Sequence, residues 1–176
     1  GDIPLLRALG EANGFSVDTI APVQRDGATV SSTRIRAALR DGDPREAARL
    51  LTRPYTIAGV VQHGDKVGRT LGFPTANIDM ANYLRPRFGI YAVRGRLADG
   101  RMLDGAANLG VRPSFDPPKE LLEPYFFDFS GDLYGQTIAV ELIDFIRPEA
   151  KFDSMGALME QIAADCEQAK VMLAGV

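Results

Sequence analysis

The sequence predicts a mainly β protein, an antiparallel barrel or sandwich with a C-terminal helix, preceded by a short α/β segment. From Tyr55 onward, short alternating or β-branched segments follow one another, with turn signals and no helices between them. Before Pro54 the pattern is largely helical. At the end of the chain, apolar residues again recur at helical spacing.

The first segment begins with an amphipathic pattern. Three leucines at positions 5, 6 and 9 share one helical face, and Asn13-Gly14 is a suitable helix stop. From Phe15 to Thr19, apolar or β-branched residues alternate with polar ones as far as Pro22, which predicts a short strand.

Two further helices are expected before residue 54. "VSSTRIRAALRDGD" predicts a helix from Thr33 that ends at Gly42. Asp43 is a suitable N-cap for the next helix, with Pro44 at its first position and Glu46 completing a capping box. The pattern changes after this helix. We therefore predict two domains, 1–53 and 54–176.

Five strands are expected in the second domain. Ala98-Asp99-Gly100 and Ser130-Gly131-Asp132 are turn signals between them. The strand-like segments are 55–62, 90–97, 101–110, 121–129 and 137–146. Asp153 or Ser154 caps the final helix. Its apolar stripe, which we interpret as packing against the sheet, consists of Met155, Leu158, Met159, Ile162, Cys166 and Ala169.

The composition excludes several classes of function. The 176 residues are 45% hydrophobic and 24% charged, the balance of a soluble globular protein. No apolar run is long enough to span a membrane. The net charge of −3 does not fit a nucleic-acid-binding protein, which needs many cations to neutralise phosphates.

The single cysteine and single histidine restrict the chemistry further. Cys166 cannot form an intramolecular disulfide and fits a reducing compartment, so we expect a cytoplasmic protein. Cys166 is interpreted as a buried hydrophobe rather than a catalytic thiol, which would have to use His63. One His and one Cys cannot build a typical zinc site. A bound metal should be a hard cation on oxygen ligands.

The stretch "HGDKVGRTLGFPTAN" resembles a phosphate-binding loop without matching the Walker A pattern. Gly64 and Gly68 are separated by three residues where four are needed, and Arg69 replaces the lysine. A Walker loop also leads into a helix, whereas Pro74 and Thr75 do not favour one here. This segment is therefore not a P-loop of that fold.

The same stretch still has features that suit a nucleotide. Gly64, Gly68 and Gly72 allow the backbone to approach phosphate oxygens, and Lys66 and Arg69 supply positive charge. The alternative is an ordinary glycine-rich hairpin with exposed basic residues.

Two further positions are candidates for the chemistry. Thr75 and Asn77 are two residues apart, so on a strand both face the same side and offer neutral oxygen ligands to Mg²⁺. Glu123 is flanked by leucines and phenylalanines, where desolvation would raise its pKa and make it a better general base. A solvated, outward-facing Glu123 is the alternative. Pro124 suggests a sheet edge or a bulge.

At these residues the sequence resembles a known family. The blocks "GRTLGFPTANI", "RFGIYAV", "NLGVRPSF", "LLEPYFFDFSGDLYG" and "FIRPEAKFDSMGALMEQIAADC" occur in the order and rough spacing of riboflavin kinase. The chain is similar to the kinase module of bacterial bifunctional riboflavin kinase/FMN adenylyltransferases (FAD synthetases), from about Pro54 to Leu173. Where the family commonly has Val-His after the catalytic glutamate, this chain has Pro124-Tyr125.

The resemblance implies a six-stranded antiparallel Greek-key barrel with a C-terminal helix. It implies transfer of the ATP γ-phosphoryl group to riboflavin to give FMN. Thr75 and Asn77 would hold Mg²⁺, the 64–72 loop would cover the phosphates, and Glu123 would be the base. The stretch from "DLYG" to "RPEAKF" would form a flap over the flavin, with Arg147 and Phe152 as weaker flavin-binding candidates.

The resemblance also covers residues 1–53, which are similar to the end of the adenylyltransferase domain. That domain needs a His-x-x-His-type motif, and the only histidine is His63. We therefore expect a truncated form that makes no FAD. Apolar residues left exposed in the N-terminal segment could cause self-association. A non-catalytic barrel that binds flavin or nucleotide is the alternative function.

Overall fold

The computed structural model describes residues 2–63, 73–112 and 118–175. The chain separates into two compact units, residues 1–31 and 32–176. Each unit is described by itself below.

The first unit contains helix α1 (Ile3–Asn13), which ends where the sequence predicts. Gly14 adopts the left-handed conformation, with φ of 74°, and its N–H donates to the carbonyl of Gly10. The strand predicted over residues 15–22 is wrong, because these residues have no partner strand among the described residues and form no regular structure. Strands β1 (Gln24–Arg25) and β2 (Ala28–Thr29) pair instead.

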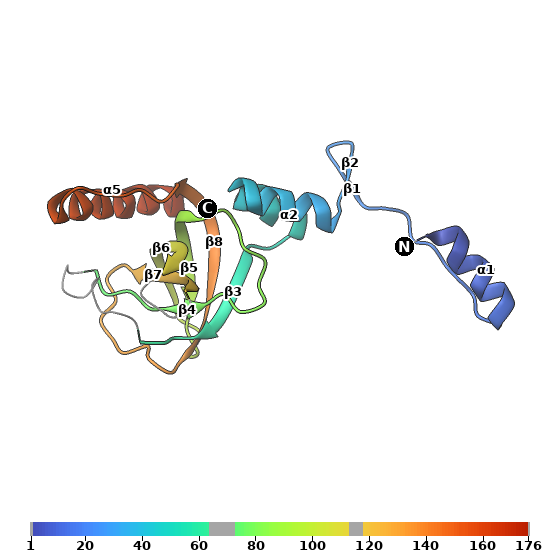
Figure 1. Cartoon of the computed structure of the whole chain (residues 1–176), viewed down its shortest axis with the longest axis horizontal. Coiled ribbons are helices and arrows are strands. Elements are labelled where there is room, and N and C mark those ends of the chain that lie inside the picture. Colours follow the sequence, from blue (N-terminus) through green and yellow to red (C-terminus); the bar gives the residue numbers. More distant parts are fainter. Residues whose placement is uncertain (1, 64–72, 113–117, 176) are drawn as a thin grey trace. The chain divides into compact units, whose positions relative to one another are not determined.

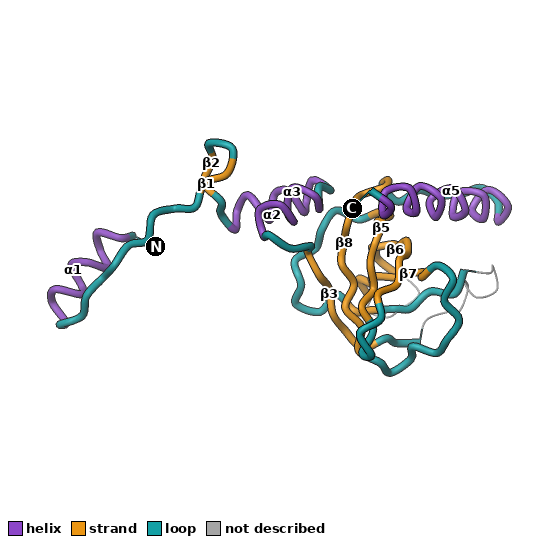
Figure 2. Tube along the Cα trace, turned by 180° about the vertical axis from the view of Figure 1, so that it is seen from behind, coloured by secondary structure: helices purple, strands orange, loops and turns teal. Residues whose placement is uncertain are grey.

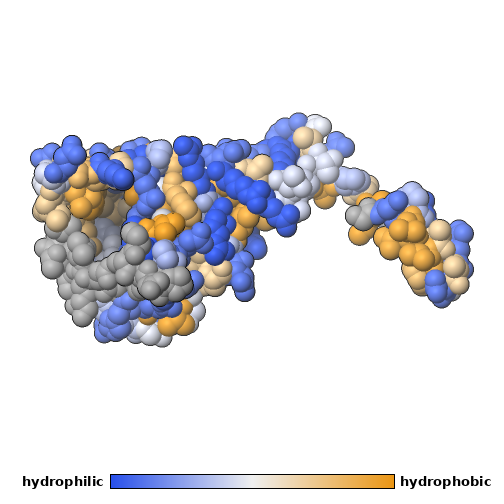
Figure 3. Space-filling view, in the orientation of Figure 1, coloured by the Kyte–Doolittle hydropathy of each residue, from blue (hydrophilic) through white to orange (hydrophobic). Residues whose placement is uncertain are grey.

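The apolar side chains of α1 are exposed to solvent, as the sequence suggested. Leu5, Leu6 and Leu9 are 57%, 46% and 44% exposed, and Ile20 in the following segment is 95% exposed. Figure 3 shows hydrophobic surface over α1 in the first unit.

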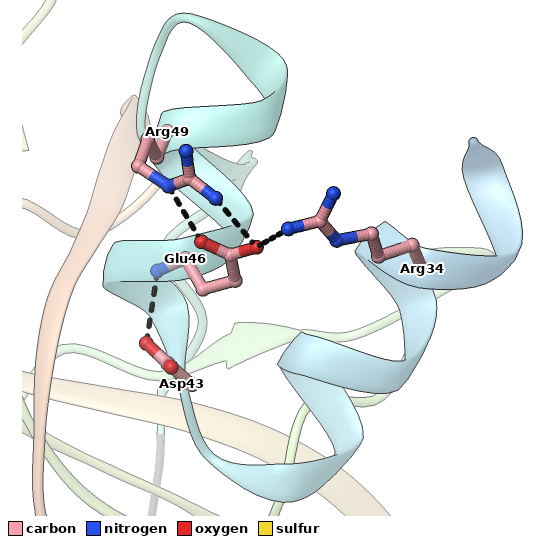
Figure 4. Close-up of polar contacts among 4 residues, drawn as sticks. All are labelled: Arg34, Asp43, Glu46 and Arg49. Atoms are coloured by element: carbon pink, nitrogen blue, oxygen red, sulfur yellow. Dashed lines mark hydrogen bonds and ion pairs between the residues drawn. The ribbon is translucent and has the colours of Figure 1, made fainter. Parts of the chain in front are cut away.

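The second unit begins with helices α2 (Ser32–Asp41) and α3 (Pro44–Leu51), joined through Gly42 and Asp43. Half of the predicted capping box forms, because the Asp43 carboxylate accepts a hydrogen bond from the Glu46 N–H at 2.8 Å. The Glu46 carboxylate instead accepts from Arg49 at 2.7 Å and from Arg34 at 2.7 Å (Figure 4). The hydrogen bond from Arg49 is the main cause that holds the pKa of Glu46 below its usual value. The cluster therefore ties α2 to α3.

The two helices pack on the barrel that follows. Leu39 and Ala47 are buried and contact Tyr55 and Leu84. The guanidinium of Arg45 on α3 forms an ion pair with Asp144 at 2.6 Å. Residues 32–53 thus pack into the same compact unit as the barrel. The boundary that we predict at residue 54 separates a remnant of an adenylyltransferase domain from the kinase barrel. This assignment of residues 1–53 stays a prediction.

The barrel is one six-stranded antiparallel sheet in the order β3-β8-β5-β6-β7-β4 (Figures 1 and 2). The strands are β3 (Tyr55–Val60), β4 (Ile78–Asp79), β5 (Gly89–Arg96), β6 (Met102–Arg112), β7 (Lys119–Phe126) and β8 (Thr137–Arg147). Consecutive strands β5, β6 and β7 are neighbours, and β8 returns to pair with β5, which is the Greek-key arrangement. The five predicted strand segments are confirmed; β4 is two residues long and was not among them.

A single bridge brings the two edges of the sheet together. The N–H of Gln62, just after β3, donates to the carbonyl of Asn77, just before β4, at 2.8 Å. This contact nearly closes the sheet into a barrel. Alternate residues of each strand fill the interior, and the largest fully buried side chains there include Ile57, Ile78, Tyr91, Leu109, Leu122 and Leu142.

Helix α5 (Met155–Ala174) covers the outer face of β5, β6 and β8 (Figure 1). The Ser154 hydroxyl accepts from the Ala157 N–H at 3.1 Å, which confirms one of the two predicted caps. Only the second half of the predicted apolar stripe is buried. Cys166 and Ala169 pack on the sheet, whereas Met155 and Met159 are 55% and 41% exposed because the helix contacts the sheet through its later turns. No helix in the described part of the chain is long and apolar enough to cross a membrane.

Candidate active site

The alternation of each strand places the candidate residues on one side of the sheet. Ala76 and Ile78 point into the barrel core, so Thr75 and Asn77 face outward. In β7, Leu122 points inward and Glu123 therefore faces outward. The hydroxyl, amide and carboxylate that the sequence singled out thus share the outer face of the sheet, where Asn77 is buried at 6% exposure.

The strand register brings Asn77 next to Glu123. Ile78 pairs with Leu122 in the antiparallel ladder between β4 and β7. Just before that pair, the N–H of Ala76 donates to the carbonyl of Pro124 at 2.9 Å. Asn77 lies between these two contacts and so stands opposite Glu123. Thr75, two residues earlier, continues the same row toward the end of β7.

Glu123 is neither fully desolvated nor freely solvated. Its side chain is 15% exposed and forms an ion pair with the guanidinium of Arg112. The same guanidinium lies 3.8 Å from the carboxylate of Glu149, which follows β8. Glu149 lies directly over Gly110, where an added Cβ would be 2.1 Å from its Oε1. Arg112 thus connects the candidate base to the segment after β8.

Pro124 fits into β7 without disturbing the pairing. The register between β6 and β7 runs without a shift from Gly105 opposite Phe126 to Arg112 opposite Lys119. The bulge suggested for Pro124 is therefore wrong. The alternative, a sheet edge, is nearer to what is found, because the described β4 pairs only with Leu121 and Leu122 of β7. The Pro124 carbonyl accepts from the Ala76 N–H, but proline has no N–H to donate in return, so this pair has one hydrogen bond fewer.

Arg147, a flavin-binding candidate, makes a buried ion pair. Its guanidinium donates to both carboxylate oxygens of Asp165 on α5, at 2.8 and 2.7 Å, and Asp165 is 4% exposed. Gln161 donates to the same carboxylate at 3.0 Å. The guanidinium carbon also lies 5.7 Å from the centroid of the Phe152 ring. The geometry indicates that Arg147 fixes α5 to the end of β8; flavin binding by Arg147 and Phe152 stays a prediction.

The stretch expected to form a flap is mostly part of the sheet. Thr137–Arg147 is strand β8, hydrogen-bonded to β3 on one side and to β5 on the other. A strand with partners on both sides cannot open over a ligand. Only the segments on either side of β8, residues 127–136 and 148–154, lie outside the sheet.

A cavity of about 400 Å³ lies beside Thr75. Its walls include Pro74, Phe126, Phe129 and Tyr134, with Asp132 as a charged group. The predicted phosphate-binding residues are outside the described residues. These are Gly64, Lys66, Gly68, Arg69 and Gly72.

The two residues considered for thiol chemistry have separate roles. Cys166 lies on the buried, sheet-facing side of α5, and burial raises the pKa of its thiol to about 11. The His63 ring stacks on Tyr134, with centroids 3.8 Å apart. A buried neutral thiol is a poor nucleophile.

Several residues of this site were missed by the sequence reasoning. Arg112, Glu149 and Asp165 are ordinary charged positions in the sequence, and only the fold brings them to Glu123 and Arg147. Of these three, only Asp165 could have been found from the sequence. It immediately precedes Cys166 on the helix that we expect to pack against the sheet, which indicates that this acidic side chain lies near the interface.

Comparison with known proteins agrees with this architecture. Residues 51–173 match the family described as "Flavokinase: Riboflavin kinase". The chain is 44% identical over 170 residues to the bifunctional riboflavin kinase/FMN adenylyltransferase of Haemophilus influenzae, covering 97% of this chain and 55% of the relative. It is 40% identical over 165 residues to the protein of that name in Escherichia coli K12, covering 94% and 53%. The chain therefore spans about half the length of these relatives.

Two solved structures share the fold. A Streptococcus pneumoniae protein described as a macrolide-efflux protein superposes with a TM-score of 0.77 at 37% identity, covering 89% of this chain and 52% of the other. Riboflavin kinase from Trypanosoma brucei superposes with a TM-score of 0.52 at 26% identity, covering 69% and 80%. With the family match extending over residues 51–173 and the Greek-key barrel in place, this chain belongs to the riboflavin kinase family.

Proposed function

We propose that this chain is a riboflavin kinase, which transfers the γ-phosphoryl group of Mg-ATP to the 5′-hydroxyl of riboflavin and releases FMN and ADP. The observation that supports this most directly is the row of Thr75, Asn77 and Glu123 on one outer face, set by the β4–β7 register. A hydroxyl, an amide and a carboxylate side by side supply both oxygen ligands for a metal and a base for a hydroxyl.

Glu123 is the proposed general base. As the riboflavin oxygen forms its bond to the γ-phosphorus, its proton passes to the Glu123 carboxylate and the bond to the ADP oxygen breaks. Arg112 holds that carboxylate in place through the ion pair. A positioned base is typically worth about 10²–10⁴-fold in rate.

Thr75 and Asn77 are the proposed Mg²⁺ ligands. Both are neutral oxygen donors on the same face, so the charge of the cation would remain available to the phosphates. Within the described residues, no group of three or more His, Cys, Asp or Glu side chains offers another metal site. Bound Mg²⁺ would orient the phosphate oxygens and offset their charge.

The cavity beside Thr75 is the proposed place for part of the nucleotide. Proline, phenylalanine and tyrosine side chains line much of it, and such walls suit the flat apolar faces of a purine. The glycine-rich loop at 64–72 would then cover the phosphates.

We expect FMN but no FAD from this chain. The test is incubation with riboflavin and Mg-ATP followed by chromatography of the flavins. FMN without FAD supports the proposal. Retention of bound riboflavin or ATP without any FMN would indicate the alternative, a non-catalytic binding module. FAD formation would contradict the expectation that this chain makes no FAD.

Two further proposals concern the setting of the enzyme. We expect it to act in the cytoplasm, where ATP and a reducing environment for Cys166 are available.

We also propose that the exposed leucines of α1 promote self-association. Sedimentation of the chain and of a Leu5→Ser/Leu9→Ser variant would test this, since loss of leucines that drive association should lower the average mass.

A further inference from the structure

Asn108 on β6 carries a buried oxygen without a hydrogen-bond partner. Among the described residues, its Oδ1 is the only buried side-chain nitrogen or oxygen atom for which no partner is found. Leaving a buried acceptor unpaired costs roughly 1–3 kcal/mol. A leucine has the same branching at Cγ but no polar atom and would avoid that cost, so packing alone gives no reason for an amide at this position.

The position of Asn108 relates it to the proposed base. Asn108 stands directly opposite Glu123 in the β6–β7 register, and both face outward. Side chains directly opposite each other in an antiparallel pair have Cβ atoms about 4.5–5.5 Å apart. A substrate hydroxyl that contacts Glu123 therefore has its neighbouring groups within reach of Asn108.

Asn108 also lines a small cavity between the sheet and α5. The cavity has a volume of about 90 Å³, and its other walls include Ala106, Tyr125, Ile162 and Cys166. A cavity of this volume has room for a small polar group such as a substrate hydroxyl. Asp165 also lines the cavity, but its carboxylate already accepts hydrogen bonds from Arg147 and Gln161. Asn108 therefore offers the unpaired acceptor to an entering donor.

We propose that Oδ1 of Asn108 accepts a hydrogen bond from a hydroxyl of the polyol chain of the acceptor substrate, next to the hydroxyl that Glu123 deprotonates. This rests on the proposed function, in which the acceptor is riboflavin. Asn108 is then a specificity-determining residue, because a site built to pair with a substrate hydroxyl discriminates against analogues that lack it. The substrate hydroxyl thus donates the hydrogen bond that Oδ1 of Asn108 lacks in the protein alone.

The test compares two flavins on matched variants. Riboflavin carries the polyol chain, and lumiflavin has the same ring system with a methyl group in its place. Their dissociation constants are measured by flavin fluorescence, with lumiflavin also used as a competitor, on the wild type, Asn108→Leu, Asn108→Ser and Val171→Leu. The last variant changes a residue of α5 that is 76% exposed and does not line the cavity.

We expect Asn108→Leu to weaken riboflavin binding about 3- to 10-fold, which corresponds to one neutral hydrogen bond. Lumiflavin binding should be unchanged, Asn108→Ser should retain more riboflavin affinity than Asn108→Leu, and Val171→Leu should bind both flavins as the wild type does. The thermal midpoint of Asn108→Leu without ligand should be equal to or above that of the wild type, because a buried unpaired acceptor has been removed.

Equal riboflavin affinity in Asn108→Leu and the wild type would overturn the proposal. So would an equal loss for riboflavin and lumiflavin, or a lowered thermal midpoint, which would indicate a structural asparagine. The proposed function is tested separately by FMN formation in the wild type. If no FMN forms but riboflavin binding still depends on Asn108, the kinase assignment fails and the binding role of Asn108 remains.

Discussion

Replacing Asp165 by alanine should destabilise the second unit far more than replacing a neighbouring acid on the same helix. The Asp165 carboxylate is 4% exposed and accepts three hydrogen bonds from the Nε and Nη2 atoms of Arg147 and one from Gln161. Removing it leaves the Arg147 guanidinium, 20% exposed, without its carboxylate partner. Breaking one side of a buried ion pair costs about 3–5 kcal/mol. Total stabilities are about 5–15 kcal/mol, so this is a large fraction.

Helix α5 provides a matched control two residues further on. Glu167 pairs with Lys170 at 2.8 Å, but these side chains are 73% and 49% exposed. Exposed pairs contribute about 0–1 kcal/mol, so Glu167→Ala should be close to neutral. The two substitutions remove the same kind of charge from the same helix and differ in burial.

The assay is urea denaturation followed by far-ultraviolet circular dichroism, since the chain has no tryptophan. With a denaturant slope of about 2 kcal/mol per M, the Asp165→Ala midpoint should fall by about 1.5–2.5 M. Asp165→Asn keeps one acceptor oxygen for Arg147 and should fall less, which preserves the comparison if Asp165→Ala does not fold. Equal midpoints for Asp165→Ala and Glu167→Ala would refute the reasoning that burial makes this pair strong.

Four further predictions concern the site and the core. Glu123→Gln should lower turnover about 10²–10⁴-fold while ATP binding stays near normal; an unchanged turnover would remove Glu123 from the role of base. Thr75→Ala should raise the Mg²⁺ concentration needed for half-maximal rate, and a rate indifferent to Mg²⁺ would contradict the ligand assignment. Cys166, whose pKa burial raises to about 11, should react with a thiol reagent at pH 8 far more slowly in the folded protein than in urea, and equal rates would show that the thiol is accessible. Gly89→Ala should destabilise by about 2–5 kcal/mol, because φ is 150° and a Cβ would lie 2.3 Å from the Arg147 carbonyl oxygen. Gly100→Ala, with φ of 87° and open space, should cost only about 1–3 kcal/mol in thermal or urea unfolding.

Local signals in the sequence determined most of the elements. Asn13-Gly14 ends α1, Asp43 caps α3, and alternation after Tyr55 predicts the long strands, because caps, turns and side-chain periodicity act over a few residues. The same local reasoning was wrong for residues 15–22. Alternation there satisfies the rule for a strand, but a strand also needs a partner, and a partner is not a local property.

The sequence alone also selected Thr75, Asn77 and Glu123 as residues that suit phosphoryl transfer, through their chemistry and their motifs. Their juxtaposition was decided by the tertiary structure, since the β4–β7 register joins positions more than forty residues apart. The tertiary structure also decides which residues contact this site and Arg147. Arg112, Asn108 and Asp165 acquire their roles from cross-strand register and from the docking of α5, and neither is encoded by neighbours in the chain.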